Sequence, residues 1–412
     1  MMPVTSPRQP LKSLDDALAE LLGHAVPLDR FETVSTFDAD GRVLAQDLIA
    51  EMDVPANDNS AMDGYAVRSA DWLSAATVMQ VNQRIAAGSS GTRLAAMSAA
   101  RIFTGAPIPD GSDAVVMQED CTPAEAGSVC IATQPQAGQW IRRRGEDVMS
   151  GCKVLPKGEL LAPQSIGLAA SIGYGNLCVA APVRVALFST GDELVMPGDV
   201  APADMKPGAI YNSNRFFLRA LLQRLGCKVT DMGIVPDKLE ATKAALLSAS
   251  AAHDLVLTSG GVSVGEEDHI KPAVQALGQL NLWQIAMKPG KPFAYGQIAN
   301  AHFIGLPGNP VSSFVTFLLL VRPFVRKLQG AIQIAPESIA AYADFTWDIA
   351  DKRREFLRVR RNAAGGLDLF DNQSSGVLTS AVWADGLVDN PAGNTIGHGD
   401  VVRFMPFSSL IL

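Results

Sequence analysis

The sequence predicts an α/β multidomain protein in which a doubly wound α/β domain is accompanied by β-rich regions. Between residues 182 and 330, short apolar runs alternate with amphipathic helical segments, which is typical of a parallel sheet with right-handed crossovers. Residues 51–147 and 331–412 instead show short strand-like runs separated by Asn, Asp, Gly and Pro. A chain of 412 residues is also too long for one ordinary domain.

Composition narrows the class of protein. With 48% hydrophobic and 18% charged residues, the chain is an ordinary globular protein. Its net charge of −8 disfavours nucleic-acid binding, which requires an excess of Lys and Arg. The five cysteines are scattered without a C-x-x-C pair, and the most apolar run, residues 314–321, is too short to cross a membrane. We therefore expect a reduced, cytoplasmic protein without a membrane segment.

The first elements are a helix and a set of long polar loops. Ser13-Leu14-Asp15-Asp16 is a capping box followed by leucines at helical spacing, which predicts a helix from about residue 13 to residue 22. Polar loops then interrupt the β-rich region at residues 53–68, 102–120 and 141–148. Each loop alone is either a solvated surface or part of a binding site, but three in one module favour a functional role.

Strands and helices alternate through the α/β region. A strand over residues 184–190 leads into Gly191-Asp192-Glu193, and the helix that follows ends at Gly226. Residues 237–240 form a second capping box. The remaining expected elements are a helix through residue 252, a loop at residues 288–296 and a long helix over residues 311–328.

The stretch from Asp254 to Pro272 carries the strongest local signal. An apolar strand over residues 255–257 is broken by Ser259-Gly260-Gly261 and Ser263, and helical spacing resumes at residue 270. Glycines allow a ligand to approach the backbone, and N–H groups at a helix start favour an anion. Neighbouring carboxylates would suit a hard cation that bridges to phosphate. A ligand site is therefore favoured over a plain strand-to-helix turn, although the stretch matches neither a Walker A loop nor G-x-G-x-x-G.

Several charged residues follow strands that share one edge of the predicted sheet. Glu193, Asp237 and Asp268 supply hard oxygen ligands for Mg²⁺, and Lys288 and Lys291 suit phosphate or another oxyanion. No Ser-His-Asp or Cys-His arrangement is evident. This pattern favours charge positioning and metal-assisted transfer over covalent catalysis.

Nine motifs in register resemble one known family over nearly the whole chain. They are DNSAMDGYAVR, FTGAPIPDG, MQED, RRRGEDV, STGDEL, YNSN, TSGGVSVGEEDHIK, MKPGKPFAYG and GLPGNPVSSFVTF. Together they are similar to the molybdopterin molybdotransferases of the MoeA type, to which the gephyrin E domain is related. The resemblance implies an N-terminal helix region (1–30) packed on an α/β molybdopterin-binding domain (182–330), a small linking α+β domain (31–50 and 148–181), a β-rich insertion module (51–147) and a C-terminal β domain (331–412).

The resemblance also implies an activity. Family members insert molybdate into the dithiolene of adenylylated molybdopterin and release AMP in a Mg²⁺-dependent hydrolysis, the last step of molybdenum cofactor biosynthesis. They are elongated homodimers whose active site lies between the α/β domain of one subunit and the β modules of the other. A molybdopterin adenylyltransferase and cofactor-accepting molybdoenzymes are the partners that this activity implies.

The family's site residues can be placed on this sequence. Its functional acids fall on Asp63, Glu193, Asp237 and Asp268, with Glu193 and Asp268 as the metal ligands, and its threonine falls on Thr104. Its oxyanion-facing positions correspond to Lys288, Lys291, Arg358 and Ser375. The remaining candidate substrate-binding residues are Ser259, Gly260, Gly261, Ser263, Arg143, Asp147, Pro307 and Pro310.

Departures from the family pattern and two alternative functions remain open. Asn57-Asp58 replaces the usual aromatic residue before DNSAMD, Lys238 follows Asp237 where the family usually has a second acid, and Cys121 replaces a common threonine. The α/β region alone also resembles molybdopterin adenylyltransferases and nucleotide pyrophosphatase-like proteins. A non-catalytic cofactor-binding scaffold is the other alternative, but the metal acids and the oxyanion set favour an enzyme.

Overall fold

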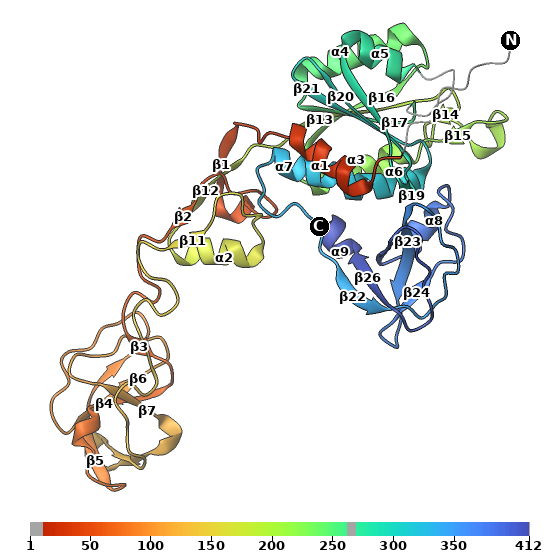
Figure 1. The fold of residues 1–412 in the computed structure, drawn as a ribbon. Helices are drawn as coiled ribbons and strands as arrows, with labels where there is room; N and C mark the ends of the chain where they lie inside the picture. Colours follow the sequence, from red (N-terminus) through yellow and green to blue (C-terminus); the bar gives the residue numbers. More distant parts are fainter. Residues whose placement is uncertain (1–10, 262–268, 412) are drawn as a thin grey trace, which may run out of the picture.

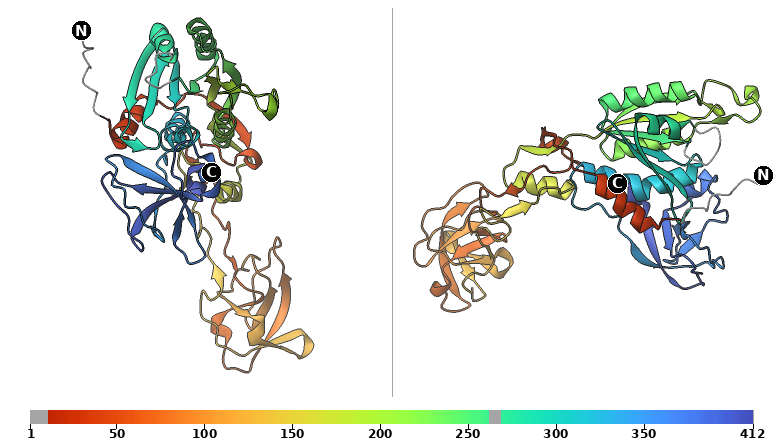
Figure 2. Two further views of the ribbon diagram at one scale, coloured as in Figure 1. Left: turned by 90° about the vertical axis from the view of Figure 1, so that its right-hand side faces the viewer. Right: turned by 45° about the horizontal axis from the view of Figure 1, so that its top comes forward.

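The computed structural model describes residues 11–261 and 269–411, and it shows an elongated chain of several bodies (Figure 1). The α/β domain and a C-terminal β domain lie side by side at one end. A small linking domain leads from them to a β-rich module, which is at the opposite end of the molecule in all three views (Figures 1 and 2). In the described part of the chain, no helix is long and apolar enough to cross a membrane.

The α/β domain is built on a six-stranded mixed sheet. Its order is β16-β13-β17-β21-β20-β18, in which the first four strands are parallel, β20 runs antiparallel to β21, and β18 runs antiparallel to β20. The region predicted as a loop at residues 288–296 instead contains most of β20, because this segment folds back onto β21 as a hairpin. The strands are β13 (Arg184–Thr190), β16 (Lys228–Val235), β17 (Leu255–Ser259), β18 (Gly278–Gln284), β20 (Pro292–Ile298) and β21 (Ala301–Leu306).

Helices cover both faces of this sheet. Alternate residues of β13 point to opposite sides: Val185 and Leu187 pack in one apolar cluster, and Ala186 and Phe188 pack in the other. The first cluster is covered by α1, α3, α6 and α7, and the second by α4 and α5 (Figure 1). These helices are α1 (Leu14–His24), α3 (Asn214–Arg224), α4 (Leu239–Ala252), α5 (Ile270–Leu277), α6 (Pro310–Thr316) and α7 (Arg322–Leu328).

The helix ends follow the sequence signals in part. Ser13 caps α1 and accepts a hydrogen bond from the Asp16 backbone N–H, as predicted. The prediction of a second capping box is wrong, because the N-cap residue of α4 is Lys238 and its side chain makes no capping hydrogen bond. The predicted long helix is continuous, but a π-helical stretch (Phe317–Val321) joins α6 to α7. Pro323 lies just beyond this stretch, and it lacks the N–H that a regular α-helix would use.

The chain runs through the linking domain twice, once before it enters the module and once after it leaves. The linking domain pairs β1 (Phe31–Ser35) with β12 (Asn176–Ala180) and β2 (Leu48–Ile49) with β11 (Lys153–Leu155), and it carries α2 (Pro163–Ser171). The two segments that connect the linking domain to the module run side by side, and the Val54 N–H donates to the Val148 carbonyl at 2.7 Å.

The module is a six-stranded sheet with an apolar cluster on each face. Its order is β7-β4-β6-β5-β9-β8, and β5 and β6 are its parallel pair. A short ladder between β3 (Asn59–Ser60) and β10 (Ile141–Arg142) lies beside it. The sheet strands are β4 (Gly64–Val67), β5 (Thr77–Ile85), β6 (Ser98–Ile102), β7 (Ala114–Met117), β8 (Cys121–Ala124) and β9 (Ser128–Ile131).

The C-terminal β domain is joined to the α/β domain by a strand that the α/β region adds to its sheet. Its sheet has the order β19-β23-β25-β26-β22, and β19 (Met287–Lys288) comes from the α/β region of the chain. Phe356, Leu387 and Met405 of this domain belong to the same apolar cluster as the α/β helices. Its other elements are β22 (Ile339–Tyr342), β23 (Arg354–Arg361), β24 (Leu367–Leu369), α8 (Leu378–Trp383), β25 (Gly386–Asn390), β26 (Val401–Pro406) and α9 (Phe407–Ile411).

Candidate functional site

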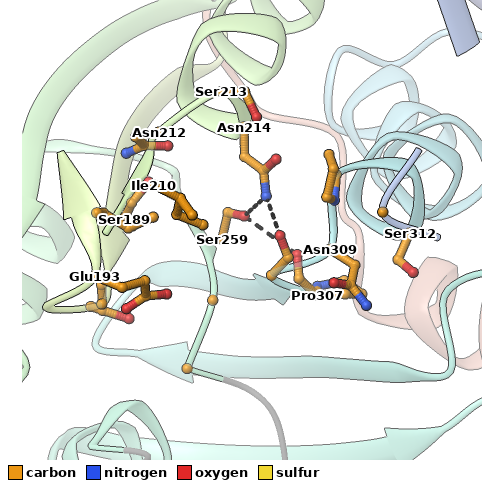
Figure 3. Close-up of a pocket in the computed structure, with 18 of the residues that line it drawn as sticks. Ser189, Glu193, Ile210, Asn212, Ser213, Asn214, Ser259, Pro307, Asn309 and Ser312 are labelled. Atoms are coloured by element: carbon orange, nitrogen blue, oxygen red, sulfur yellow. Dashed lines mark hydrogen bonds between the residues drawn. The ribbon is translucent and has the colours of Figure 1, made fainter. Parts of the chain in front are cut away.

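A pocket of about 700 Å³ opens at the carboxyl ends of β13, β17 and β21. This is the sheet edge at which the sequence predicted a ligand site, and it is where ligands bind in open α/β sheets. The C-terminal domain reaches the pocket through Gly376. The polar lining residues are Ser189, Thr190, Glu193, Tyr211, Asn212, Ser213, Asn214, Asp237, Ser259, Asn309 and Ser312 (Figure 3).

The predicted strand–turn–helix arrangement forms one wall. β17 ends at Ser259, and Gly260 and Gly261 both have positive φ, +95° and +67°. A Cβ at Gly261 would lie 2.6 Å from Ile270 Cγ1, and one at Gly260 would lie 2.9 Å from the Thr190 carbonyl oxygen. Only glycine fits both positions, because the turn is left-handed and is packed against the neighbouring strand end and α5. Ser263 and Asp268 lie outside the described residues.

Three segments far apart in the sequence are joined at the base of the pocket. Asn214 Nδ2 donates to Ser259 Oγ at 2.8 Å and to the Gly308 carbonyl at 2.7 Å (Figure 3). Ser259 Oγ in turn donates to the Pro307 carbonyl at 3.4 Å. The Ser259 hydroxyl is thus engaged within the protein, and it fixes the spacing between the two turns. Asn214 was not among the predicted site residues, although the YNSN motif that contains it was noted.

Two carboxylates supply the charge that lines the pocket. Glu193 follows β13, and a Cβ on Gly191 would lie 2.5 Å from Glu193 Oε2, so glycine makes room for this carboxylate. Asp237 lines the same pocket, and its backbone N–H donates to Asp192 Oδ1 at 3.2 Å. No Lys or Arg belongs to the described lining. Among the described residues there is no group of three or more His, Cys, Asp or Glu side chains placed to hold a metal ion.

Two buried polar atoms in the lining have no hydrogen-bond partner within the described protein. They are Ser189 Oγ and Asn212 Nδ2, on residues that are only 1% and 2% exposed. Buried polar groups are nearly always paired, so these atoms are the ones that a bound ligand or water would satisfy. Sequence reasoning missed both residues, since neither a serine inside a strand nor an asparagine in a turn signals burial.

The predicted oxyanion set does not converge on the pocket in this structure. Lys288 Nζ donates to Glu355 Oε1 at 2.9 Å and lies 3.5 Å from Asp351 Oδ2, so it faces the C-terminal domain. Lys291 is exposed at the start of β20. Arg358 is 1% exposed, and burial lowers its pKa to about 10.

The Arg358 guanidinium supports a loop instead of facing the pocket. It donates to the Phe356 carbonyl at 3.0 Å, to Ser380 Oγ at 3.2 Å and to the Ser374 carbonyl at 3.5 Å. Ser375, the next residue, is the member of the set that reaches the pocket wall. Its hydroxyl accepts from Asn309 Nδ2 at 3.0 Å, and its carbonyl accepts from the Val311 N–H at 2.9 Å. Pro310 begins α6 at this point, and Pro307 belongs to the lining.

The remaining candidate residues belong to the module, which lies at the opposite end of the molecule from the α/β domain that holds the pocket (Figure 2). Asp63 Oδ1 accepts hydrogen bonds from the backbone N–H and the hydroxyl of Thr104, both at 2.8 Å, and these bonds lower the Asp63 pKa. Arg143 Nη1 donates to Asp58 Oδ2 at 2.6 Å, so the loops around residues 58 and 143 are joined. Asp147 is exposed.

Three family models match the chain in succession. The MoeA N-terminal region (domain I and II) matches residues 12–173, a probable molybdopterin-binding domain matches residues 186–327, and the MoeA C-terminal region (domain IV) matches residues 340–407. A Haemophilus influenzae protein named molybdopterin molybdenumtransferase is 39% identical over 97% of this chain and 99% of its own length. A Mycobacterium tuberculosis protein named molybdopterin molybdenumtransferase 2 is 34% identical, over 91% of this chain and 93% of its own.

Solved structures agree with these matches. A molybdopterin biosynthesis MoeA protein from Pyrococcus horikoshii OT3 has a TM-score of 0.84 at 28% identity, and the comparison covers 96% of this chain and all of that one. A second crystal structure of a Pyrococcus horikoshii MoeA protein has a TM-score of 0.76 at 30% identity, covering 97% and 99% of the two chains.

Proposed function

Because the chain belongs to the MoeA family of molybdopterin molybdenumtransferases, we propose that it inserts molybdate into the dithiolene of adenylylated molybdopterin and releases AMP. The chain is a transferase of molybdenum cofactor biosynthesis, and the proposed reaction is the last step of that route. Molybdate and adenylylated molybdopterin are substrates in this reaction, and Mg²⁺ is the proposed resident metal.

The pocket at the carboxyl edge of the sheet is the observation that carries the proposal. Its volume of about 700 Å³ falls within the range of roughly 300–1,000 Å³ that is usual for small-molecule sites. Hydroxyl, amide and backbone groups dominate its lining, and Ser189 Oγ and Asn212 Nδ2 remain to be satisfied by a ligand. A pterin, which carries several donors and acceptors, suits such a lining.

The donor set fits a magnesium ion. Mg²⁺ is commonly held by one or two carboxylates together with substrate phosphates, and Glu193 offers a carboxylate inside the pocket. Glu193, together with Asp268, which lies outside the described residues, would hold the ion. When bound, Mg²⁺ would neutralise negative charge on the phosphoanhydride of the substrate. Asp237 lines the pocket beside this position and is the proposed second acid of the reaction.

We propose a homodimer with shared sites. Asp63 and Thr104 lie on the module, at the far end of the chain from the pocket (Figure 2). If these residues act on the substrate, they must reach the pocket of a second copy. Ser375, at the pocket wall, and the exposed Lys291 are proposed to attract molybdate, and Arg358 and Lys288 are proposed to hold the C-terminal domain around them.

The two alternatives are less well supported. A stand-alone adenylyltransferase or a pyrophosphatase-like protein would need only the α/β domain, whereas this chain matches its Haemophilus relative over 99% of the relative's length. A scaffold would not need a carboxylate-lined pocket with unsatisfied polar groups. Transfer of substrate from an adenylyltransferase, delivery to molybdoenzymes and a cytoplasmic location remain predictions.

The purified protein should release AMP from adenylylated molybdopterin only when Mg²⁺ and molybdate are both present, and the product should reconstitute a molybdenum-free apoenzyme. Glu193→Gln should abolish both signals. Glu240→Gln, which changes an exposed acid of α4, is the matched control and should keep full activity. Full AMP release without molybdate and without cofactor formation would instead identify a hydrolase.

A further inference from the structure

One end of the module sheet carries a row of cationic and aromatic side chains. Arg84 of β5 pairs directly with Arg101 of β6, and Arg101 pairs with Tyr65 of β4, so the three side chains lie on the same face. The Arg84 guanidinium carbon lies 4.5 Å from the Phe103 ring centroid. That of Arg101 lies 4.8 Å from the Phe103 ring and 5.1 Å from the Tyr65 ring.

The two arginines place like charges opposite each other in the sheet, and Asp63 is near enough to Arg101 for the arginine charge to help lower the Asp63 pKa. Like charges directly opposite each other in a sheet destabilise it. Yet no ion pair joins either arginine to a carboxylate in residues 11–261 and 269–411. The Phe103 and Tyr65 rings offset part of the repulsion, because a ring face attracts a cation. The arrangement is therefore one that an external anion would stabilise.

The row is held in place on one side and open on the other. Arg101 Nη1 donates to the Gly64 carbonyl at 3.1 Å, and its Nη2 donates to Gln118 Oε1 at 2.6 Å, which fixes its guanidinium. Arg84 is exposed and contacts the Phe103 ring, and its guanidinium forms no hydrogen bond within residues 11–261 and 269–411. A planar guanidinium of this kind matches the geometry of a phosphate group.

The position of the row connects it with the reaction. Gly64 follows Asp63, and Phe103 precedes Thr104, so the row adjoins the Asp63–Thr104 pair along two strands of the module. The α/β pocket contributes carboxylates but no Lys or Arg among its described lining residues. Apart from the exposed Lys291, which precedes the lining residue Pro292, basic side chains for a phosphate-bearing substrate in that pocket would come from another part of the dimer.

We propose that Arg84 and Arg101 bind a phosphate group of the substrate, with Phe103 and Tyr65 as apolar support, when the module covers the pocket of a second copy. This inference rests on the proposed function. It adds a phosphate-binding face that the carboxylates of the pocket do not provide. In adenylylated molybdopterin a phosphoanhydride joins the molybdopterin phosphate to the AMP phosphate, and the chemistry that both share is an anionic phosphate.

The test compares two exposed arginines of the same module. Arg84→Gln should raise the KM for adenylylated molybdopterin about tenfold with kcat changed less than about twofold, as expected for the loss of a charge-assisted contact to a bound group. Arg93→Gln removes the same charge from another exposed site and should leave KM unchanged. Arg84→Lys should recover part of the affinity, because lysine keeps the positive charge but loses the planar guanidinium that binds phosphate through two hydrogen bonds.

Equilibrium binding measurements distinguish the AMP phosphate from the molybdopterin phosphate. They also test the phosphate-binding face independently of the proposed function. Arg84→Gln should weaken AMP binding if the face holds the nucleotide phosphate, or molybdopterin binding if it holds the pterin phosphate, and either result supports the face. Equal KM and equal binding of both probes in the Arg84→Gln and Arg93→Gln proteins would overturn it. If wild-type protein shows no molybdate-dependent AMP release, the proposed function fails, while the binding comparison still decides the phosphate face.

Discussion

Replacing Glu355 with glutamine should loosen the junction between the α/β domain and the C-terminal domain. Glu355 is 1% exposed, and its two oxygens serve different partners. Oε1 accepts from Lys288 Nζ at 2.9 Å, and Oε2 accepts from Trp347 Nε1 at 2.8 Å. A glutamine amide keeps only one oxygen, so in Glu355→Gln one of these donors must face an NH₂ group.

The magnitude follows from these contacts. A hydrogen bond to a charged group contributes about 1.5–3 kcal/mol, and a buried donor left unpaired costs about 1–3 kcal/mol. The Lys288 side chain is 32% exposed, so water will solvate part of its ammonium. We therefore expect Glu355→Gln to lower the free energy of unfolding by about 2 kcal/mol, below the roughly 3–5 kcal/mol observed for fully buried ion pairs.

The assay is urea unfolding followed by tryptophan fluorescence, because Trp347 lies in the junction itself. Asp348→Asn removes an exposed carboxylate from the same domain and should change the unfolding free energy by less than about 0.5 kcal/mol. Combining Glu355→Gln with Lys288→Met should destabilise less than the sum of the single changes, by about 1 kcal/mol. If Glu355→Gln behaves like Asp348→Asn, or if the two changes are additive, the ion pair does not hold the junction.

Three further outcomes are expected. Thr104→Val removes one of the two hydrogen bonds that lower the Asp63 pKa; the carboxylate should therefore protonate at higher pH as acid is added, which a carboxyl NMR titration against Asp63→Asn will detect. Gly261→Ala should destabilise the protein by about 1–3 kcal/mol and weaken substrate binding, because its φ of +67° and the nearby Ile270 side chain exclude a methyl group; a thermal melt that matches wild type would contradict this. Mixing Glu193→Gln chains with Asp63→Asn chains should restore about a quarter of wild-type activity through hybrid dimers with one intact site, whereas sites contained within single chains would show no recovery.

The sequence was most informative where local chemistry decides the structure. The turn Ser259-Gly260-Gly261 and the Ser13 cap of α1 were predicted because glycine conformations and capping hydrogen bonds depend on a few neighbouring residues. The β-rich character of the module was also readable, since its short runs are separated by turn-forming residues. The family resemblance then supplied the activity, which no spacing argument could name.

The structure departs from the sequence expectations mainly where residues pair with partners distant in the sequence. Lys288 was expected to face an oxyanion, but the acid beside it is 67 positions further along the chain. Arg358 was assigned to the same set, yet its burial depends on a loop that only the folded C-terminal domain creates. The β20 segment was predicted as part of a loop because KPGKP suggests a turn, and its burial on both faces leaves no alternating signal.

The small strand β19 has a consequence for attempts to isolate the parts of this protein. Met287 and Lys288 pair with Arg354 and Glu355, so a fragment that ends with the α/β domain would leave a sheet edge open. It would also uncover the apolar helix surface that Phe356 and Met405 protect. Open edges and bare apolar faces promote aggregation. Expression of the α/β domain alone should therefore give poorly soluble material, whereas a fragment that retains the C-terminal domain should remain in solution.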